Sequence, residues 1–150
     1  MAADATLTES VEVGVPARRL WDAVVDWPSQ SRWMLLTRVR GTAQDGHGLG
    51  GGIEAFTGVG RVGVLDTMTI TEWDPPRRCA VVHTGRVVRG TAVFDVVPCG
   101  AGRSRLVWTE NLEIPFRAVG RLGWRLGRPV ARAGVVYSLN RLHRVLECGR

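Results

Sequence analysis

Hydrophobic and polar residues alternate near the start of the chain. Between residues 5 and 15, Leu7, Val11 and Val13 share one parity with Glu9, and the intervening positions are mostly polar. A period of two over this length predicts a half-buried β-strand.

Two short helices are predicted after this strand. Pro16 can begin a helix over residues 17–25, because its missing N–H group would have no partner in the first helical turn. Asp26 or Ser29 can then cap a second short helix that runs toward Trp33.

The middle of the chain consists of short apolar segments separated by turn residues. The pattern predicts β-strands over residues 38–41, 53–58, 62–73, 78–85, 87–97 and 105–114. The separators are rich in Gly, Pro and Asp, which favour turns. Parallel strands need connections of about a dozen residues or more, so connections this short predict an antiparallel sheet.

The last third of the chain changes to a helical period. Apolar side chains step by three or four residues at Val119, Leu122, Leu126, Val130, Ala133 and Tyr137. Arginines step likewise along a second face, which becomes apolar at Val135, Leu139, Leu142 and Leu146. Pro129 precedes that change, and a proline bends or interrupts a helix. We therefore expect one long C-terminal helix with a kink or break near residues 127–129.

Several short motifs accompany this order of elements. They are Val13-x-Val15-Pro16-Ala17-x-x-Leu20-Trp21-x-x-Val24-x-Asp26-Trp27, then Trp33, Thr71-Glu72-Trp73-Asp74-Pro75-Pro76-Arg77-Arg78, His83-Thr84-Gly85, Trp108-Thr109-Glu110 and Ser138-Leu139-x-x-Leu142. Taken in order, they cover almost the whole chain. The chain resembles the START-like superfamily, also called SRPBCC or helix-grip, in its polyketide cyclase/dehydrase-like branch.

The resemblance implies a particular α+β architecture for residues 1–150 as a single domain. This is the helix-grip fold: a seven-stranded curved antiparallel sheet around a long C-terminal helix, with two short helices after the first strand. It also implies a cavity between sheet and helix. The fold itself implies no one function, because it hosts lipid carriers, hormone receptors, cyclases and stress proteins.

Small residues recur along the C-terminal helix at helical spacing. They are Gly120, Gly123, Gly127, Ala131 and Gly134. An interior glycine costs up to about 1 kcal/mol relative to alanine, so a structural reason is expected. Either the helix backbone lies close to the sheet here, or bulk is left out to make room for a ligand. In the second case Leu122, Leu126, Val130 and Tyr137 would flank the ligand.

Strand parity nominates the opposite wall of the cavity. Phe94 faces inward with the apolar set of its strand, and Trp108 shares its inward parity with Glu110. In segment 62–73, Met68 and Asp66 lie on the same face of the predicted strand. The residues at the alternate positions are equally suited to face inward, and the sequence does not choose between the two faces. We expect Met68, Phe94, Trp108 and Glu110 to contact the ligand.

Four residues are candidates for acid–base chemistry: Glu110, His83, Asp66 and Tyr137. A carboxyl group in an apolar cavity has a raised pKa and can donate a proton, although such a residue more often reaches solvent or pairs with an arginine. His83 could act as a general base or be held as a structural histidine by a neighbouring strand. The three histidines lack metal-ligand spacing, so neither a metal nor a cofactor is expected.

Amino-acid composition and charge indicate which kinds of binding partner and which cellular location to expect. All 20 basic residues are arginines, the net charge is +6, and the arginines are spread from Arg18 to Arg150. Without a basic run or motif, nucleic-acid binding is not favoured. No apolar run approaches the roughly 18 residues that span a membrane. The first residues lack signal-peptide features, and the three cysteines lack paired spacing, so a cytoplasmic location is expected.

Three functional hypotheses follow from the sequence. The first is the binding of a small apolar, lipid-, polyketide- or terpenoid-like molecule in the internal cavity. The second is an enzyme resembling polyketide cyclases, aromatases or dehydratases, in which a shaped pocket folds a reactive chain and one or two groups move protons. The third is association with protein or RNA through the arginine face of the last helix. The chain could be a monomer or a homodimer.

Overall fold

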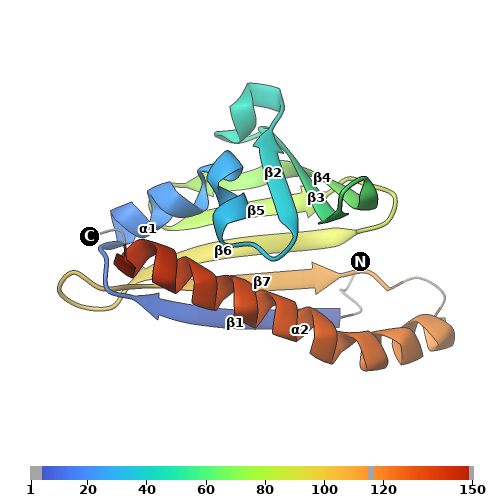
Figure 1. Ribbon diagram of the computed structural model, residues 1–150. Helices are drawn as coiled ribbons and strands as arrows, with labels where there is room; N and C mark the ends of the chain where they lie inside the picture. The colour runs from blue at the N-terminus through green and yellow to red at the C-terminus, as the bar shows by residue number, and fades with distance from the viewer. Residues whose placement is uncertain (1–4, 115–116, 149–150) are drawn as a thin grey trace.

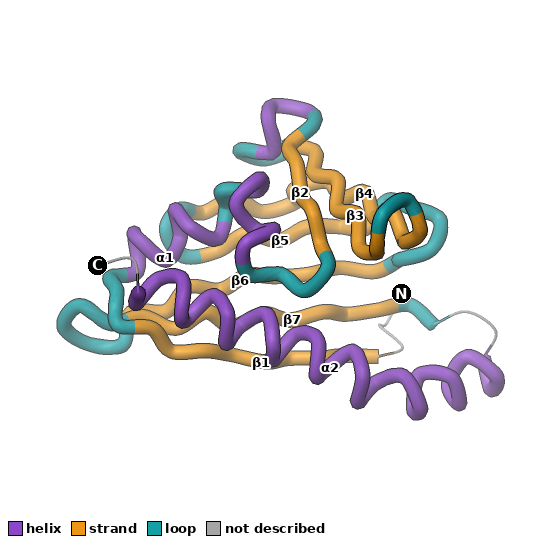
Figure 2. Tube along the Cα trace, in the orientation of Figure 1, coloured by secondary structure: helices purple, strands orange, loops and turns teal. Residues whose placement is uncertain are grey.

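The computed structural model describes residues 5–114 and 117–148, which form one sheet, two α-helices and two short 3-10 helices (Figures 1 and 2). The elements in chain order are β1 (Ala5–Val13), α1 (Ala17–Val24), η1 (Trp27–Arg32), β2 (Thr37–Gly41), η2 (Ala43–Gly46), β3 (Gly52–Val59), β4 (Val62–Asp74), β5 (Arg78–His83), β6 (Gly90–Pro98), β7 (Ser104–Leu112) and α2 (Arg117–Cys148).

The strands form a single seven-stranded sheet in the order β1-β7-β6-β5-β4-β3-β2, and every neighbouring pair is antiparallel. From β2 to β7, consecutive strands are neighbours, as their short connections require. β1 instead joins the far edge of the sheet by pairing with β7, with Val11 opposite Leu106. The predicted α+β helix-grip architecture is confirmed.

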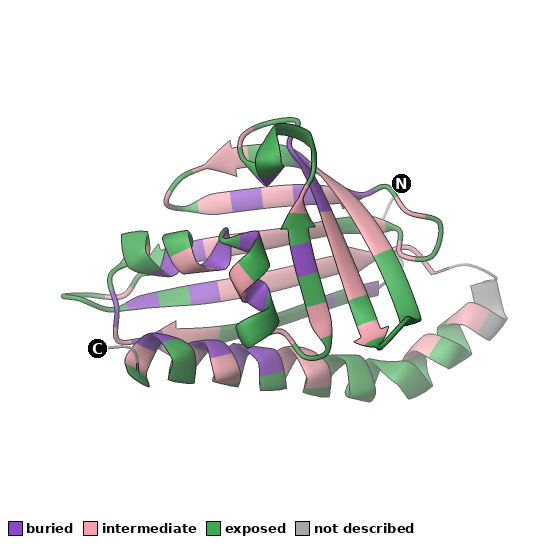
Figure 3. Ribbon diagram, turned by 45° about the horizontal axis from the view of Figure 1, so that its top comes forward, coloured by how far each residue is buried: buried purple, intermediate pink, exposed green. Residues whose placement is uncertain are grey.

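Both α-helices pack on one face of the sheet and enclose the core with it (Figure 3). From α1, Leu20 and Val24 are fully buried, as their spacing on one helical face requires. From the C-terminal half of α2, Leu139, Leu142 and Leu146 enter the same core. Within the described part of the helix, only this half contributes to the buried core.

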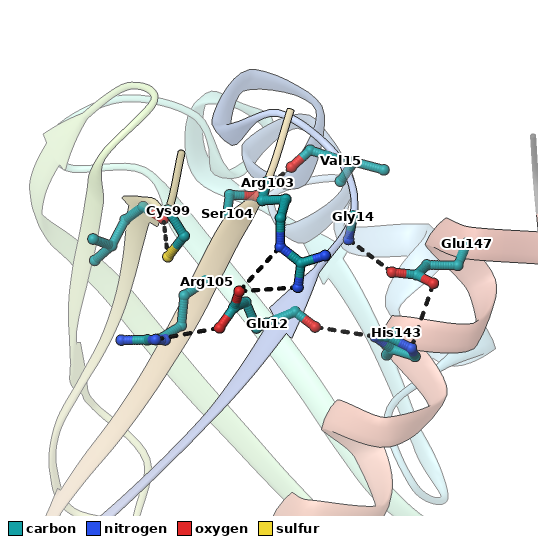
Figure 4. A network of polar contacts seen from close by, with 10 residues as sticks. Glu12, Gly14, Val15, Cys99, Arg103, Ser104, Arg105, His143 and Glu147 are labelled. Atoms are coloured by element: carbon teal, nitrogen blue, oxygen red, sulfur yellow. Dashed lines mark hydrogen bonds and ion pairs between the residues drawn. The ribbon is translucent and has the colours of Figure 1, made fainter. Parts of the chain in front are cut away.

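Polar contacts attach the C-terminal end of α2 to the end of β1 (Figure 4). The backbone N–H of Gly14 donates a hydrogen bond to the Glu147 carboxylate at 2.7 Å. Nδ1 of His143 lies 3.0 Å from the carbonyl oxygen of Glu12. These contacts hold the C-terminal end of the helix against the edge strand.

The helix is continuous through Pro129, so of the two expected alternatives, a kink or a break, the break does not occur. In Figures 1 and 3 it bends within its first half, which contains Pro129, and this end extends past the sheet. A bend is the usual response of a helix to an internal proline.

Two glycines in this half do not lie against the sheet. A side-chain carbon added at Gly123 or Gly127 would meet no atom within 4 Å, and one at Gly134 would make an ordinary contact with Leu35. Close packing on the sheet therefore fails as an explanation for Gly123 and Gly127. Both residues are also exposed and neither lines the internal cavity described below, so the second explanation, room left for a ligand, fails at these two positions as well.

A β-bulge explains why the inward face of β4 could not be chosen from sequence. Ile70 pairs with Val81 and Glu72 pairs with Ala80, so Thr71 is an extra residue in the ladder. An extra residue reverses which parity faces inward. Before the bulge, Met68 and Ile70 face inward, and after it Trp73 does. Each of the two alternating sets of residues is therefore inward-facing on one side of the bulge.

Candidate functional site

A cavity of about 200 Å³ lies between η1 and the inner face of strands β2 to β7. Most of the side chains that line it are apolar. They include Trp27, Met34, Val39, Ile53, Ala55, Met68, Cys79, Val81, Ala92, Phe94 and Trp108, with Gln30, Thr37, Thr57, Asp66, His83 and Glu110 as polar members. No residue of α2 in the described part of the chain lines the cavity.

His83 forms the centre of a polar cluster in this apolar wall. Its ring Nδ1 lies 2.9 and 3.0 Å from the two carboxylate oxygens of Asp66. Its Nε2 lies 3.1 Å from Oε2 of Glu110, whose Oε1 accepts a hydrogen bond from Trp108 at 2.8 Å. The side chain of His83 is 3% exposed, so solvent hardly reaches the imidazole, and each of its two nitrogens contacts a carboxylate.

These contacts determine the protonation state of His83. Burial lowers the pKa of the imidazole, but the hydrogen bonds that the ring donates to Asp66 and Glu110, together with the charges of these carboxylates, outweigh burial and raise the pKa from 6.5 to about 9. At neutral pH the ring is therefore an imidazolium that donates one N–H to each carboxylate. With both carboxylates ionised, the cluster carries a formal charge of −1.

Strand register and two small residues bring the cluster together. His83 is the last residue of β5, and β6 lies between it and Glu110 of β7. In β6, Gly90 is opposite His83 and Ala92 is opposite Glu110. Because these positions carry little or no side chain, the Glu110 carboxylate reaches the imidazole across the intervening strand.

Gly90 is also required by its own backbone. Its φ is +121°, and a side-chain carbon there would lie 1.9 Å from the carbonyl oxygen of Asn111. Residues 84–89 belong to no strand, so β6 begins at Gly90 and not, as the sequence predicted, at Val87.

The structure brings six of the residues predicted from sequence together around the cavity. They are Met68, Phe94, Trp108, Glu110, His83 and Asp66. The other four lie elsewhere. Leu122, Leu126 and Val130 are exposed on α2, and Tyr137 borders a separate shallow depression with Leu36 and Arg141. The cavity thus lies farther from the N-terminal half of α2 than the sequence led us to expect.

Strand parity did not nominate the part of the wall that comes from η1 and β2. Gln30 and Met34 line the cavity from η1 and the turn after it, and Val39 from β2. Their segments are short, and the periodicity that could show their orientation covers too few residues. Gln30 is buried and donates a hydrogen bond to the carbonyl oxygen of Val24.

Cys79 lines the cavity as a buried thiol. Burial, with a smaller contribution from the negative charge of Glu72, raises its pKa to about 12, so it remains protonated at neutral pH. No group of three or more His, Cys, Asp or Glu side chains among the described residues is arranged to hold a metal ion.

Comparison with known proteins places the chain in a family. The family model for polyketide cyclase/dehydrase and lipid transport proteins matches residues 4–147. The chain belongs to this family. A search of curated protein sequences finds no match.

Solved structures with the same fold include three informative neighbours. A protein from Thermus thermophilus is 17% identical with a TM-score of 0.80, covering 97% of this chain and 100% of that one. The Zhui aromatase/cyclase from a Streptomyces species is 17% identical with a TM-score of 0.78, covering 95% and 93%. The di-domain ARO/CYC protein BexL is 17% identical with a TM-score of 0.73, covering 95% of this chain and 46% of that one. At these identities the likeness establishes the fold.

Proposed function

We propose that the chain binds a small, largely apolar molecule in the cavity and directs a polar group of that molecule at the Asp66–His83–Glu110 cluster. The observation that carries the proposal is a buried ionic cluster set in a mostly apolar cavity. Ligand sites typically combine an apolar lining with a few converging polar groups of perturbed pKa.

The cavity volume limits the part of a ligand that fits inside. An apolar cavity of about 150 Å³ accommodates benzene. A volume of about 200 Å³ therefore suits a single substituted ring, or a segment of similar size from a longer chain. Phe94 and Trp108 are T-shaped neighbours with ring centroids 5.3 Å apart, and they offer aromatic surface to such a ring.

The charge of the cluster selects the polar group of the ligand. Both N–H groups of His83 already point at carboxylates, so the oxygens of Asp66 and Glu110 are the acceptors that remain. A hydroxyl or ammonium group complements a formal charge of −1, whereas a carboxylate is repelled by it.

Single-ring probes test this binding mode directly. We expect phenol and benzylamine to raise the melting temperature and change the tryptophan fluorescence, and benzoate to do neither. Ala92→Leu, which fills the cavity next to Glu110, should abolish both effects. Thr91→Leu is the matched control, because Thr91 is the adjacent residue of β6 and is exposed. Equal binding of the three probes, or unchanged binding by folded Ala92→Leu protein, would contradict the proposal.

A second candidate function is enzymatic, and the same cluster favours it. An imidazolium held between two carboxylates places a proton donor and proton acceptors beside one apolar space. General acid–base catalysis of cyclisation or dehydration requires these groups. Two structural neighbours, the Zhui aromatase/cyclase and the di-domain ARO/CYC protein BexL, support this chemistry as the alternative.

The enzymatic candidate is tested by separating binding from turnover. With a short poly-β-keto thioester as substrate, Glu110→Gln should retain binding and lose turnover by about 100-fold or more, the usual contribution of a general acid or base. Thr91→Leu should leave turnover unchanged. If the double variant Glu110→Gln, His83→Asn turns over the substrate at the original rate, the cluster is not catalytic.

A further inference from the structure

The N-terminal half of α2 belongs to neither the cavity nor the core. From Arg121 to Ala133 every residue except Trp124 is exposed. Leu122, Leu126 and Val130 are 58%, 73% and 74% exposed. In Figure 3 this end of the helix runs past the sheet, and most of it has the colour of exposed residues. Large apolar side chains at this spacing normally cover a neighbouring surface.

These side chains form a continuous apolar strip, defined here as Leu36, Leu122, Leu126, Val130 and Tyr137. The helical members are four, four and seven residues apart and so share one side of α2. Leu36 extends the strip from the turn before β2, since it borders the same shallow depression as Tyr137. Its side chain is 56% exposed, on a backbone with φ of 52° that leucine seldom adopts.

The same helix carries the net charge of the whole chain. Residues 117–148 contain seven arginines and one glutamate, which gives a formal charge of +6. The remaining 13 arginines and 13 acidic residues cancel. Arg121, Arg125 and Arg128 are exposed and form no ion pair among the described residues, whereas Arg132 pairs with Glu9 of β1.

We propose that the N-terminal half of α2 docks the protein on an anionic membrane surface. A helix that combines exposed apolar side chains with arginines lies in the interface between lipid headgroups and acyl chains. Here the apolar strip would enter the acyl boundary, and the long arginine side chains beside it would reach lipid phosphates. Such docking is peripheral, since no helix in the described part of the chain is long and apolar enough to cross a membrane.

Charge distinguishes a membrane from the other surfaces that could cover the strip. A second copy that presents the same helix would bring arginines against arginines, because no acidic residue occurs between Glu113 and Glu147. The rest of a second copy has no net charge to attract the helix. A nucleic acid would neutralise the arginines but leave the strip in water. An anionic lipid surface satisfies both features.

Sedimentation with vesicles tests the proposal on the full-length protein. We expect binding to phosphatidylcholine vesicles that contain about one-third phosphatidylglycerol, little binding to phosphatidylcholine alone, and a steep loss with added salt. The variant Arg121→Gln, Arg125→Gln, Arg128→Gln should bind about 100-fold more weakly, since each surface arginine contributes roughly fivefold. Leu122→Ser, Leu126→Ser, Val130→Ser should lose binding by a similar factor.

Two control variants match these changes on exposed positions elsewhere. Arg19→Gln, Arg61→Gln, Arg86→Gln removes three charges, and Leu49→Ser, Val62→Ser, Val87→Ser removes three exposed apolar side chains. Both should bind vesicles like the unchanged protein. Circular dichroism confirms folding of each variant, and the lipid and salt dependence of the unchanged protein provides a test that needs no variant.

Several results would overturn membrane docking. These are equal affinity for neutral and anionic vesicles, an equal loss of binding in the control variants, and no vesicle binding at any salt concentration. Dimers in sedimentation equilibrium that dissociate with the strip variant would assign the strip to a second copy. RNA binding without vesicle binding would assign the arginines to nucleic acid. None of these outcomes bears on binding of phenol or benzylamine in the cavity.

Discussion

At the scale of single residues, His83 couples the candidate site to the stability of the fold. Its folded-state pKa of about 9 lies above the value of 6.5 expected when the chain is unfolded. The folded protein therefore holds a proton that the unfolded chain releases first. The resulting stabilisation is fully present below about pH 6.5 and is lost as the pH rises through about 9.

This linkage predicts a pH-dependent free energy of unfolding. We expect urea denaturation to show a loss on the order of 3 kcal/mol between about pH 6 and pH 9, since each unit of pKa shift contributes about 1.4 kcal/mol. His83→Gln should flatten the profile. His47→Gln is the control, because His47 is exposed. A flat profile for the unchanged protein would contradict the charge state assigned to His83.

The cluster also marks the limit of sequence-based prediction for single residues. Strand parity correctly nominated Glu110 as inward-facing, and His83 and Asp66 were candidates for acid–base chemistry. Their mutual contact depends on strand register and on Gly90 and Ala92, whose small size lets Glu110 reach across β6. The alternation of residues within one strand shows which side chains face inward. It does not show whether small residues in a neighbouring strand leave room for those side chains to meet.

At the scale of elements, α2 is one continuous helix with two different environments. Leu142 is 1% exposed in the core, whereas Leu126 is 73% exposed beyond the sheet. Leu142→Ala should therefore lower the free energy of unfolding by about 2–5 kcal/mol, because it removes packed methyl groups and leaves a cavity. Leu126→Ala should change it by no more than about 0.5 kcal/mol.

Urea denaturation of the two leucine variants under identical conditions provides the comparison. The substitution, the helix and the change in side-chain volume are the same, so only burial differs. Similar losses in both variants would show that Leu126 packs against protein in solution, and the exposed half of α2 would need a different description.

The two environments explain why the sequence predicted the helix itself but not the surroundings of its N-terminal half. The apolar side chains of that half were expected to line the cavity, and they do not. Its spacing of apolar residues indicated an apolar side at Leu122, Leu126 and Val130, which the structure contains. Periodicity shows that one side of a helix is apolar, but not what lies against it. This end of the helix extends past the sheet (Figure 3), and nothing in the spacing of these residues encodes where the helix lies.

At the scale of the whole molecule, short turns predicted most of the sheet, because they force consecutive strands from β2 to β7 to be neighbours. The pairing of β1 with β7 joins the two ends of the predicted strand series and depends on no local signal. The family resemblance placed the first strand in the same seven-stranded sheet but did not name its partner, which the structure identifies as β7.

The concentration of charge on α2 also gives the molecule a direction. A body without net charge joined to a helix of charge +6 has a large electric dipole moment along the line between them. In the field of a negatively charged surface, rotational diffusion is biased before any contact occurs. The protein should therefore arrive with α2 leading, so its orientation is selected during the approach, and the rate of productive encounters rises above that of a randomly oriented particle.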